Sequence, residues 1–483
     1  MEKNKIFCGF ILAVCIATLW IGRATAVAAA GYELTEQQLM AEKSAWDDPR
    51  PIVPIAKKLL PPAVYKSFCH DIGKMQELQA KVVGFKSPDL VGKIAPEITP
   101  GKYTYQDKGN KPGLKALMIP LLYDQFFTKG GPPLAGCFPE IEVVPTRQVY
   151  NTLPELELTL KNLGKTKQDA RGFIDWKTWD GGIPFPKPSG SNRIKAMQIL
   201  YNFLYHHFGV DDYVYLGGGD GYDKNFRQLS TVKGFGYSMT TAGRVSNPPY
   251  GWLDKRAKDQ GELSVLQMVY FLPRDVYGNA TQLLTKLPLE EPNLLWAYAA
   301  ALRRIRKLSG TDSQDTTTGV NAILDDANGF NRKISPTVYP NEYTILEERE
   351  FLAPAYDTEG KYYYTHDKNV IMRNFKFERR PMYVIDVKSL DPSYVYSHSL
   401  LYVDKETFDV ILNIGYDRMN RMWRSGSVYY LFNPEIAWRI QTLTPCYNYL
   451  TVQSSIGLNV CVPVTYLKRE DLSLANLGRM AQK

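Results

Sequence analysis

Four short motifs contain residues that could do chemistry. Gly217–Gly221 is rich in glycine like a phosphate-binding loop, and Gly236–Thr240 is similar to the turn that carries a nucleophilic serine. Asp211-Asp212 and Asp325-Asp326 are carboxylate pairs of the kind that acid–base catalysis uses. The first motif lacks the spacing of known phosphate loops, and the second lacks the final glycine of GxSxG. We therefore predict a flexible turn at Gly217–Gly221, carboxylates that are solvated or cap turns, and no catalytic residue.

The histidines do not predict a metal site. His206 and His207 are neighbours on a predicted helix, so their side chains point about 100° apart and cannot easily bind one ion. His70, His366 and His398 have no metal-ligand spacing, and the chain has no CxxC motif. We predict neither a metal nor another cofactor.

The first 30 residues have the order of a secretory signal peptide. Lys3 and Lys5 precede the apolar stretch Ile6–Ile21, and small residues, mostly alanine, follow it. The stretch is shorter than the roughly 20 residues that span a bilayer, and Arg23 closes it. We predict that residues 1–30 are a signal peptide and that the protein is exported; a retained membrane anchor is the alternative.

Export determines how the cysteines are interpreted. The chain beyond the signal contains Cys69, Cys137, Cys446 and Cys461. In an oxidising compartment four cysteines are expected to form disulfides. Proximity in the sequence favours Cys446–Cys461 as one pair, which leaves Cys69–Cys137 as the other. Buried free thiols are the alternative.

Composition and charge exclude several classes of protein. With 44% hydrophobic and 22% charged residues the chain is an ordinary globular protein, and its 32 tyrosines favour half-buried strands. The formal charge of +8 falls to +6 without the predicted signal, because that segment holds three basic residues and one acidic residue. Only Arg303–Lys307 concentrates positive charge, so we do not expect nucleic-acid binding.

The first half of the chain predicts helices and irregular structure. Thr35 can cap a helix that runs to about Trp46, and a second helix is predicted over Ala63–Lys81. Alternating leucines predict a strand at Leu153–Leu163. The prolines of Gly181–Pro188 predict an extended turn, which leads into a helix over Ser191–Phe208.

The second half predicts an antiparallel sheet, because short segments rich in β-branched and aromatic residues alternate with tight turns. The predicted strands are Leu263–Leu272, Thr281–Leu287, Tyr383–Lys388, Val395–Val403, Phe408–Ile414, Met422–Phe432 and Trp438–Leu443. Asp404–Thr407 and Asp417–Asn420 are predicted to be tight connections. Leu294–Leu308 is ambiguous, since its alanines favour helix while Trp296 and Tyr298 suit strands.

Part of this order resembles a known superfamily. Gly261–Leu308, followed by Asp325-Asp326, Leu401–Phe408 and Tyr416-Asp417, resembles the outer-membrane lipoprotein-sorting proteins. The prolyl segment Gly182–Pro186 before a helix resembles, more narrowly, an uncharacterised family of long exported proteobacterial proteins that is grouped with them and defined by a domain of unknown function. The resemblance covers about residues 171–432.

The resemblance implies a fold. It implies an incomplete β-barrel whose concave side holds helices and accommodates acyl chains, and it implies two strands rather than a helix at Leu294–Leu308. Ala300-Ala301 depart from the proline that related sequences often have between those strands. We therefore expect a mainly β (α+β) protein with a large curved antiparallel sheet. The expected parts are an N-terminal helical and irregular region (31–170), the sheet domain (171–470) and a C-terminal tail (471–483).

The resemblance also implies a function: a non-catalytic carrier of lipids or similar hydrophobic molecules in the periplasm, or at the periplasmic face of the outer membrane, of a Gram-negative bacterium. Trp296 and Tyr298 are candidate walls of its cavity. Arg303, Arg304 and Arg306 are candidates for holding a headgroup or pairing with a lid. Related long proteins accompany export systems of the resistance-nodulation-division type, which implies such a transporter as a partner.

Two other functions stay open at this point. A hydrolase that acts on lipids or envelope polymers would need a convergent cluster of catalytic groups in a cleft. A structural or assembly component of the envelope would have a filled sheet interior and an exposed apolar patch.

Overall fold

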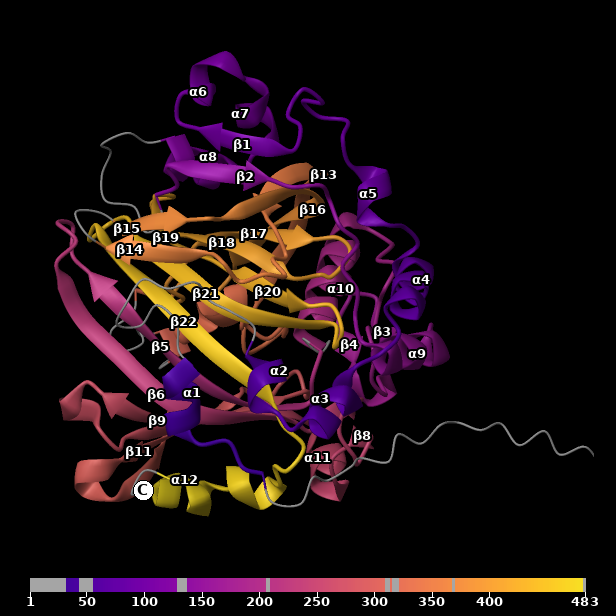
Figure 1. Cartoon of the computed structure of the whole chain (residues 1–483). Coiled ribbons are helices and arrows are strands. Elements are labelled where there is room, and N and C mark those ends of the chain that lie inside the picture. The colour runs from indigo at the N-terminus through magenta and orange to yellow at the C-terminus, as the bar shows by residue number, and fades with distance from the viewer. Residues whose placement is uncertain are drawn as a thin grey trace, which may run out of the picture.

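The structure, a computed structural model, describes residues 32–42, 55–127, 137–205, 209–308, 313–314, 321–366 and 370–480 (Figure 1). The predicted signal peptide and His206-His207 lie outside these ranges. Within them no helix is both long and apolar enough to cross a membrane.

A single 16-stranded sheet dominates the molecule. Its strands are β1 (Gly101–Thr104), β2 (Glu140–Val143), β5 (Asp212–Tyr222), β6 (Gln228–Thr240), β9 (Glu262–Leu272), β10 (Ala280–Lys286), β11 (Leu294–Ala299), β12 (Arg304–Lys307), β13 (Asn341–Pro354), β16 (Lys376–Ser389), β17 (His398–Asp404), β18 (Val410–Tyr416), β19 (Met422–Ser427), β20 (Tyr429–Asn433), β21 (Trp438–Asn448) and β22 (Gln453–Pro463). Three two-stranded pairs stand apart: β3 (Lys167–Gln168) with β4 (Ile174–Asp175), β7 (Ala242–Arg244) with β8 (Gly251–Trp252), and β14 (Tyr363–His366) with β15 (Val370–Arg373).

Short helices surround the sheet. They are α1 (Glu36–Glu42), α2 (Ala56–Leu59), α3 (Pro62–Phe68), α4 (Ile72–Val83), α5 (Ser87–Leu90), α6 (Asp107–Asn110), α7 (Gly113–Leu117), α8 (Pro120–Phe127), α9 (Leu153–Asn162), α10 (Asn192–Tyr205), α11 (Lys255–Gln260) and α12 (Leu474–Met480). Short 3₁₀ helices are η1 (Trp176–Thr178), η2 (Arg274–Val276), η3 (Ala300–Leu302), η5 (Leu324–Gly329, which is kinked at Ala327 and Asn328) and η6 (Arg469–Leu472).

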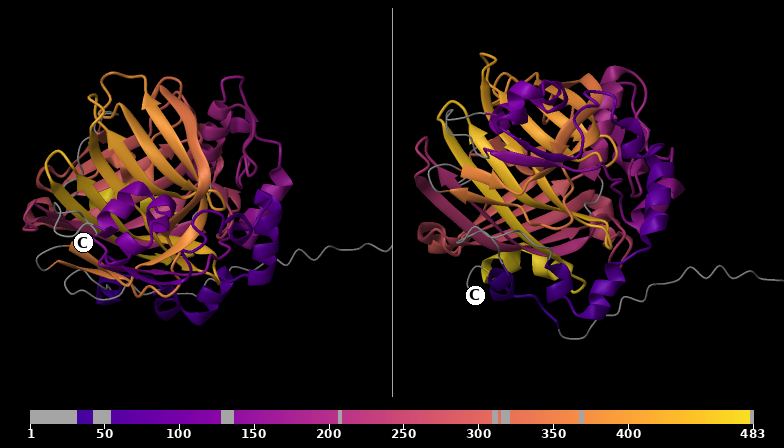
Figure 2. Two further views of the ribbon diagram at one scale, coloured as in Figure 1. Left: turned by 90° about the horizontal axis from the view of Figure 1, so that it is seen from above. Right: turned by 45° about the horizontal axis from the view of Figure 1, so that its top comes forward.

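The sheet is open and curved. Its order is β1-β2-β16-β17-β18-β19-β21-β22-β5-β6-β9-β10-β11-β12, with β13 added to β16 and β20 to β21. Neighbours are antiparallel except β2 and β16, which are parallel. Among the described residues the outermost strands, β1 and β12, do not pair with each other, and Figure 2 shows how the long strands bend around the interior. The predicted mainly β fold, a large curved antiparallel sheet covered by helices, is confirmed.

The sheet has two differently covered faces around β9, β10 and β11. On the inner face lie η5 and the C-terminal end of α10, whose Tyr201 and Tyr205 approach Leu263 and Thr285. On the outer face lie η6 and α12; Leu477 of α12 packs there in a fully buried position. Because successive side chains of a strand alternate between faces, each strand contributes side chains to the packing on both the inner and the outer face.

The N-terminal region packs against the sheet rather than apart from it. Its β2 pairs with β16, and its apolar side chains join those of the sheet in one hydrophobic core. Buried Glu406, in the tight turn after β17, accepts hydrogen bonds from the backbone N–H groups of Ser87 and Val149 and so fastens this region to the sheet. The predicted division near residue 170 stays a prediction.

The first-half predictions need two corrections. Leu153–Leu163, predicted as a strand, is the helix α9. Thr152 caps this helix by accepting a hydrogen bond from the backbone N–H of Glu155, and Pro154 occupies its first turn, where a missing N–H costs nothing. The predicted helix Ala63–Lys81 is two helices, α3 and α4, separated at Cys69–Asp71.

The second-half predictions hold in outline. All seven predicted strands exist, although Met422–Phe432 is divided into β19 and β20. Leu294–Leu308 is a pair of strands, β11 and β12, as the resemblance implied, and the break lies at η3 where Ala300-Ala301 stand. Four long strands, β5, β6, β13 and β22, were not predicted.

Candidate functional site

The inner face of the sheet holds a cavity of about 290 Å³, which we call the apolar cavity. Its walls come from seven neighbouring strands and from the segment around η5, which lies across them. Its apolar side chains are those of Val232, Leu266, Met268, Leu283, Leu295, Ala322, Ile323, Leu324 and Ala327. A concave, mostly apolar pocket of roughly 300 Å³ is at the lower end of the range for small-molecule sites.

Three glycines and Tyr215 form the part of this cavity that β5 contributes. Gly217, Gly218 and Gly219 lie in the middle of the strand, so the predicted flexible turn is wrong. A Cβ atom on Gly218 would lie 2.0 Å from the carbonyl oxygen of Val232, which shows how closely β6 approaches. Glycine inside a strand commonly marks such a close approach of backbone or ligand. The signal for a strand was present in the flanking sequence, Tyr213–Leu216 and Tyr222, which is aromatic and β-branched.

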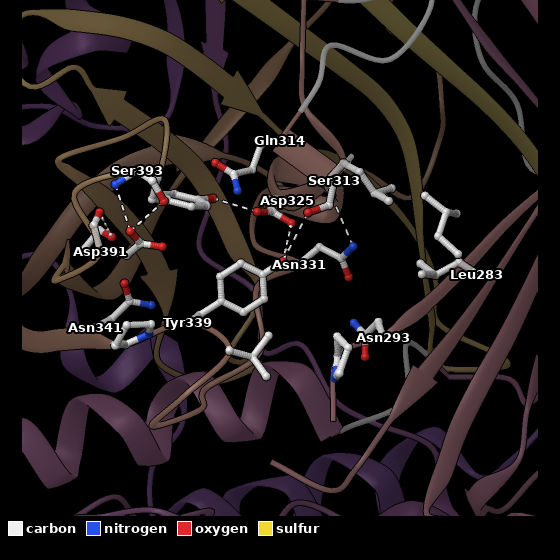
Figure 3. Close-up of a pocket in the computed structure, with 17 residues that line it drawn as sticks. Leu283, Asn293, Ser313, Gln314, Asp325, Asn331, Tyr339, Asn341, Asp391 and Ser393 are labelled. Atoms are coloured by element: carbon white, nitrogen blue, oxygen red, sulfur yellow. Dashed lines mark hydrogen bonds between the residues drawn. The ribbon is translucent and has the colours of Figure 1, made fainter. Parts of the chain in front are cut away.

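A second cavity of about 290 Å³, the polar cavity, adjoins the first (Figure 3). The two share Leu283, Leu295 and Leu324, so these leucines form the boundary between them. Polar side chains are more frequent here than in the apolar cavity, and they include those of Asn293, Asp325, Asn331, Tyr339, Asn341, Asp391, Ser393 and Tyr394. Together the two cavities offer one region for an apolar group of a ligand and an adjoining region for a polar group.

Asp325 and Asp326 are not the solvated or capping residues that were predicted. Asp325 is buried in the wall of the polar cavity, where its carboxylate accepts hydrogen bonds from the hydroxyls of Tyr394 (2.8 Å) and Tyr339 (3.1 Å). Asp326 accepts hydrogen bonds from the Tyr396 hydroxyl (2.5 Å) and the Asn413 amide. Burial raises the pKa of both carboxyls, that of Asp325 to about 6.

Replacing Asp325 by Asn is expected to change how stability depends on pH. The folded protein keeps a proton on Asp325 up to about pH 6, whereas the unfolded chain releases it near its ordinary pKa of about 4. Wild-type stability therefore falls as the pH rises through this interval, and the variant lacks that loss because the Asn side chain does not ionise. Urea unfolding measures the free energy of unfolding of both proteins. The difference between variant and wild type should shift in favour of the variant by up to about 3 kcal/mol from pH 4 to pH 7. An equal difference at both pH values would contradict the raised pKa.

Asp211 and Asp212 were also predicted to be solvated or to cap a turn, and both are buried. Asp211 accepts hydrogen bonds from the backbone N–H groups of Val245, Ser246 and Asn247. Asp212 forms a two-point ion pair with Arg244, with both N–O distances at 2.8 Å. These are structural contacts that hold the loop after β7 on the end of β5. They leave neither carboxylate available to a substrate.

Trp296 and Tyr298 lie on the outer face of the sheet. Their neighbour Leu295 lines the apolar cavity, and alternation along β11 turns Trp296 and Tyr298 the opposite way. Tyr298 packs against Leu477 of α12, and Trp296 packs against the group of residues that includes Leu472. Neither side chain lines a cavity described here. Their role as walls of a ligand cavity stays a prediction.

Arg303, Arg304 and Arg306 are exposed. Arg303 occupies the turn after η3 and the other two belong to β12, the strand at the edge of the sheet, whose four residues are all exposed. They line none of the cavities described here, and charged residues on an edge strand commonly prevent pairing with another chain. The predicted role in holding a headgroup or a lid stays a prediction.

The structure has cysteine thiols at Cys69, Cys137, Cys446 and Cys461. Neither of the predicted disulfides, Cys446–Cys461 and Cys69–Cys137, is present in the structure. Cys446 on β21 is in register with Ser455 of β22, which is six residues from Cys461. At about 3.4 Å per residue this offset is about 20 Å, several times the span of a disulfide. Burial raises the pKa of the Cys446 and Cys461 thiols to about 12, which makes them unreactive.

Comparisons with solved structures give low similarity over much of the chain. A domain from Vibrio parahaemolyticus assigned as an outer membrane lipoprotein-sorting protein is 15% identical with a TM-score of 0.42, and the match covers 60% of this chain and 100% of that one. A DUF1329 family protein from Desulfovibrio piger is 13% identical with a TM-score of 0.39, covering 56% and 92%. A LolA superfamily protein from Nitrosomonas europaea is 13% identical with a TM-score of 0.35, covering 58% and 98%.

Sequence comparison places the chain in a family. No curated protein matches it significantly. The sequence model described as protein of unknown function (DUF1329) matches residues 136–457, which is most of the chain and includes the prolyl segment and hairpins that predicted such a family. The chain therefore belongs to the DUF1329 family.

Proposed function

We propose that the protein is a non-catalytic binding protein that carries lipids or similar hydrophobic molecules in the periplasm. The observation that supports this most is the apolar cavity on the inner face of the sheet. Most of its exposed wall is apolar, from leucine, isoleucine, valine, methionine and alanine side chains and the glycine backbone of β5, and tyrosine, threonine, serine, asparagine and cysteine side chains complete it. Each CH₂ group that a ligand buries there contributes about 0.8 kcal/mol, so a long chain could bind tightly with few polar contacts.

The surroundings of the cavity favour binding over catalysis. Asp325 and Asp326, which follow the cavity-lining Leu324 in the chain, are held by tyrosine hydroxyls and an amide, and the Cys446 thiol has a raised pKa. Hydrolysis would need an activated nucleophile next to a base. In the described residues that line the apolar cavity we find no such pair, and this supports a carrier rather than a hydrolase.

Export and partnership extend the proposal. The predicted signal peptide supports a site of action in the periplasm or at the periplasmic face of the outer membrane. A transporter of the resistance-nodulation-division type, proposed from the family resemblance, would be the partner that delivers or removes the ligand.

Titration with a neutral, environment-sensitive apolar dye such as Nile red tests this function. We expect saturable binding at about one dye per chain, and displacement by 1-dodecanol. Fluorescence without saturation, or dye that dodecanol does not displace, would show that the cavity takes up no hydrophobic ligand and would overturn the proposal.

A further inference from the structure

A third cavity continues the series on the inner face. It is small, about 40 Å³, and lies between α10 and the ends of β9 and β10. Three basic side chains line it, those of Lys286, Arg332 and Lys333, and we call it the cationic cavity, although burial lowers the pKa of Lys333 to about 7. It shares Asn293 and Asn331 with the polar cavity, which in turn adjoins the apolar cavity. The three cavities therefore follow one another from apolar through polar to cationic.

Arg332 is the unusual member of the cationic cavity. Its side chain is fully buried, and none of its three guanidinium nitrogens has a hydrogen-bond partner among the residues that the structure describes. A guanidinium has five N–H donors, and buried donors are nearly always paired because an unmade hydrogen bond is costly. Arg332 is thus a buried hydrogen-bond donor without an acceptor among the described residues.

The position of the guanidinium connects two of the cavities. Its central carbon lies 5.0 Å from the ring centroid of Phe330 and 5.4 Å from that of Tyr394. Tyr394 belongs to the wall of the polar cavity, while Arg332 itself lines the cationic cavity. An anion at the junction of the two cavities would meet the guanidinium directly.

The neighbouring charged groups already have partners. The Lys333 ammonium donates to the carbonyl oxygens of Pro288 (2.7 Å) and Glu291 (2.6 Å), and Lys286 pairs with the Glu291 carboxylate at 3.4 Å. Asp325 and Asp326 attract Arg332 electrostatically but accept their hydrogen bonds from other side chains. Arg332 can therefore donate hydrogen bonds to a ligand without first breaking a hydrogen bond to another described residue.

We propose that Arg332 binds the oxyanion headgroup, a carboxylate or a phosphate monoester, of an amphipathic ligand whose hydrocarbon chain lies in the apolar cavity. This inference rests on the proposed function and names its ligand class. The planar guanidinium donates two parallel hydrogen bonds to such a headgroup, which a neutral alcohol cannot accept in the same way. The polar cavity lies between the two ends and accommodates the part of the ligand next to the headgroup.

Wild type, three variants and three ligands of equal chain length test the inference. The variants are Arg332→Met, Arg332→Lys and Arg227→Met, and each protein is titrated at pH 7 with dodecanoate, dodecyl phosphate and 1-dodecanol. In wild type at least one anionic ligand should bind about 10-fold tighter than dodecanol. Arg332→Met should lose this preference and keep its affinity for dodecanol. Arg332→Lys should keep part of it, because a lysine retains the charge but not the paired donors. Arg227, exposed in the turn between β5 and β6, is the matched control, and its variant should behave as wild type.

The outcomes separate this inference from the proposed function. If wild type binds dodecanol and the anions equally, or if Arg332→Met keeps the preference, the headgroup site is not at Arg332 while the carrier function stands. If no ligand binds, both fail. If Arg332→Met does not fold, the test uses wild type and Arg332→Lys. A preference for the anionic ligands over dodecanol that is weaker in Arg332→Lys than in wild type supports the inference, and an unchanged preference overturns it.

Discussion

Replacing Arg380 by Met is expected to lower the free energy of unfolding by about 3–5 kcal/mol. Arg380 in β16 is fully buried and binds Asp404 at 2.6 Å and Glu406 at 2.9 Å, with Glu378 at 3.8 Å. All three carboxylates are fully buried, and removing the cation leaves Asp404 and Glu406 without an ion-pair partner among the described residues in a medium of low dielectric constant, while Glu378 keeps only Arg147 at 3.9 Å. The loss also loosens the turn that fastens the N-terminal region, because Glu406 accepts the Ser87 and Val149 N–H groups.

Urea unfolding followed by circular dichroism measures this effect. Lys388→Met is the matched control, because Lys388 pairs with Glu342 on the surface at 3.5 Å with both side chains more than half exposed. Surface pairs of this kind contribute about 0–1 kcal/mol. If Arg380→Met cost no more than the control, the buried cluster would not carry the charge-pairing role that its geometry indicates.

Replacing Leu283 by Trp is expected to weaken ligand binding by at least about 10-fold. Leu283 lies on β10, faces inward and lines both the apolar and the polar cavity, so a larger indole there fills space that a chain would occupy. A strand residue moves little, and the cavity cannot easily widen to compensate. Displacement of a bound apolar dye by dodecanol, measured by fluorescence, gives the affinity.

Leu294→Trp is the matched control for this change. Leu294 neighbours Leu295 on β11 but faces the outer side, where it packs beside the group that contains Leu284. The substitution makes the same chemical change on the other face of the same ladder. We expect its binding to equal that of wild type. Equal losses in both variants would mean that the tryptophans disturb the sheet as a whole, and the placement of the ligand in the apolar cavity would then be wrong.

The sequence was most informative where local pattern and tertiary structure agree. The strands from β9 to β12 and from β16 to β21 follow alternation and tight turns, both of which are local signals. At α9 the alternating leucines fit a helix as well as a strand, and the decisive signals were the cap at Thr152 and the proline at position 154. At β5 the run of glycines is in a strand only because β6 and β22 pair with it on both sides.

The site was harder to predict than the fold for a related reason. The resemblance predicted β11, which contributes Leu295 to the apolar cavity, but the choice between the two faces of this strand depends on packing against distant elements. Neighbouring residues of a strand face opposite sides of the sheet, so the sequence did not show whether Leu295 or Trp296 faces inward. The answer depends on the positions of α12 and η5, which cover the two faces. Arg332 gave no signal at all, since an arginine in a loop is ordinarily exposed and only the fold buries it.

Native mass spectrometry of the wild-type protein, purified gently and without detergent, tests the carrier function most directly. We predict a population whose mass exceeds that of the chain by one non-covalently bound hydrophobic molecule, which is released when the collision energy is raised. Protein stripped of this molecule should take up one added dodecanoate per chain. A single species at the mass of the chain alone, which also takes up no dodecanoate, would contradict the account.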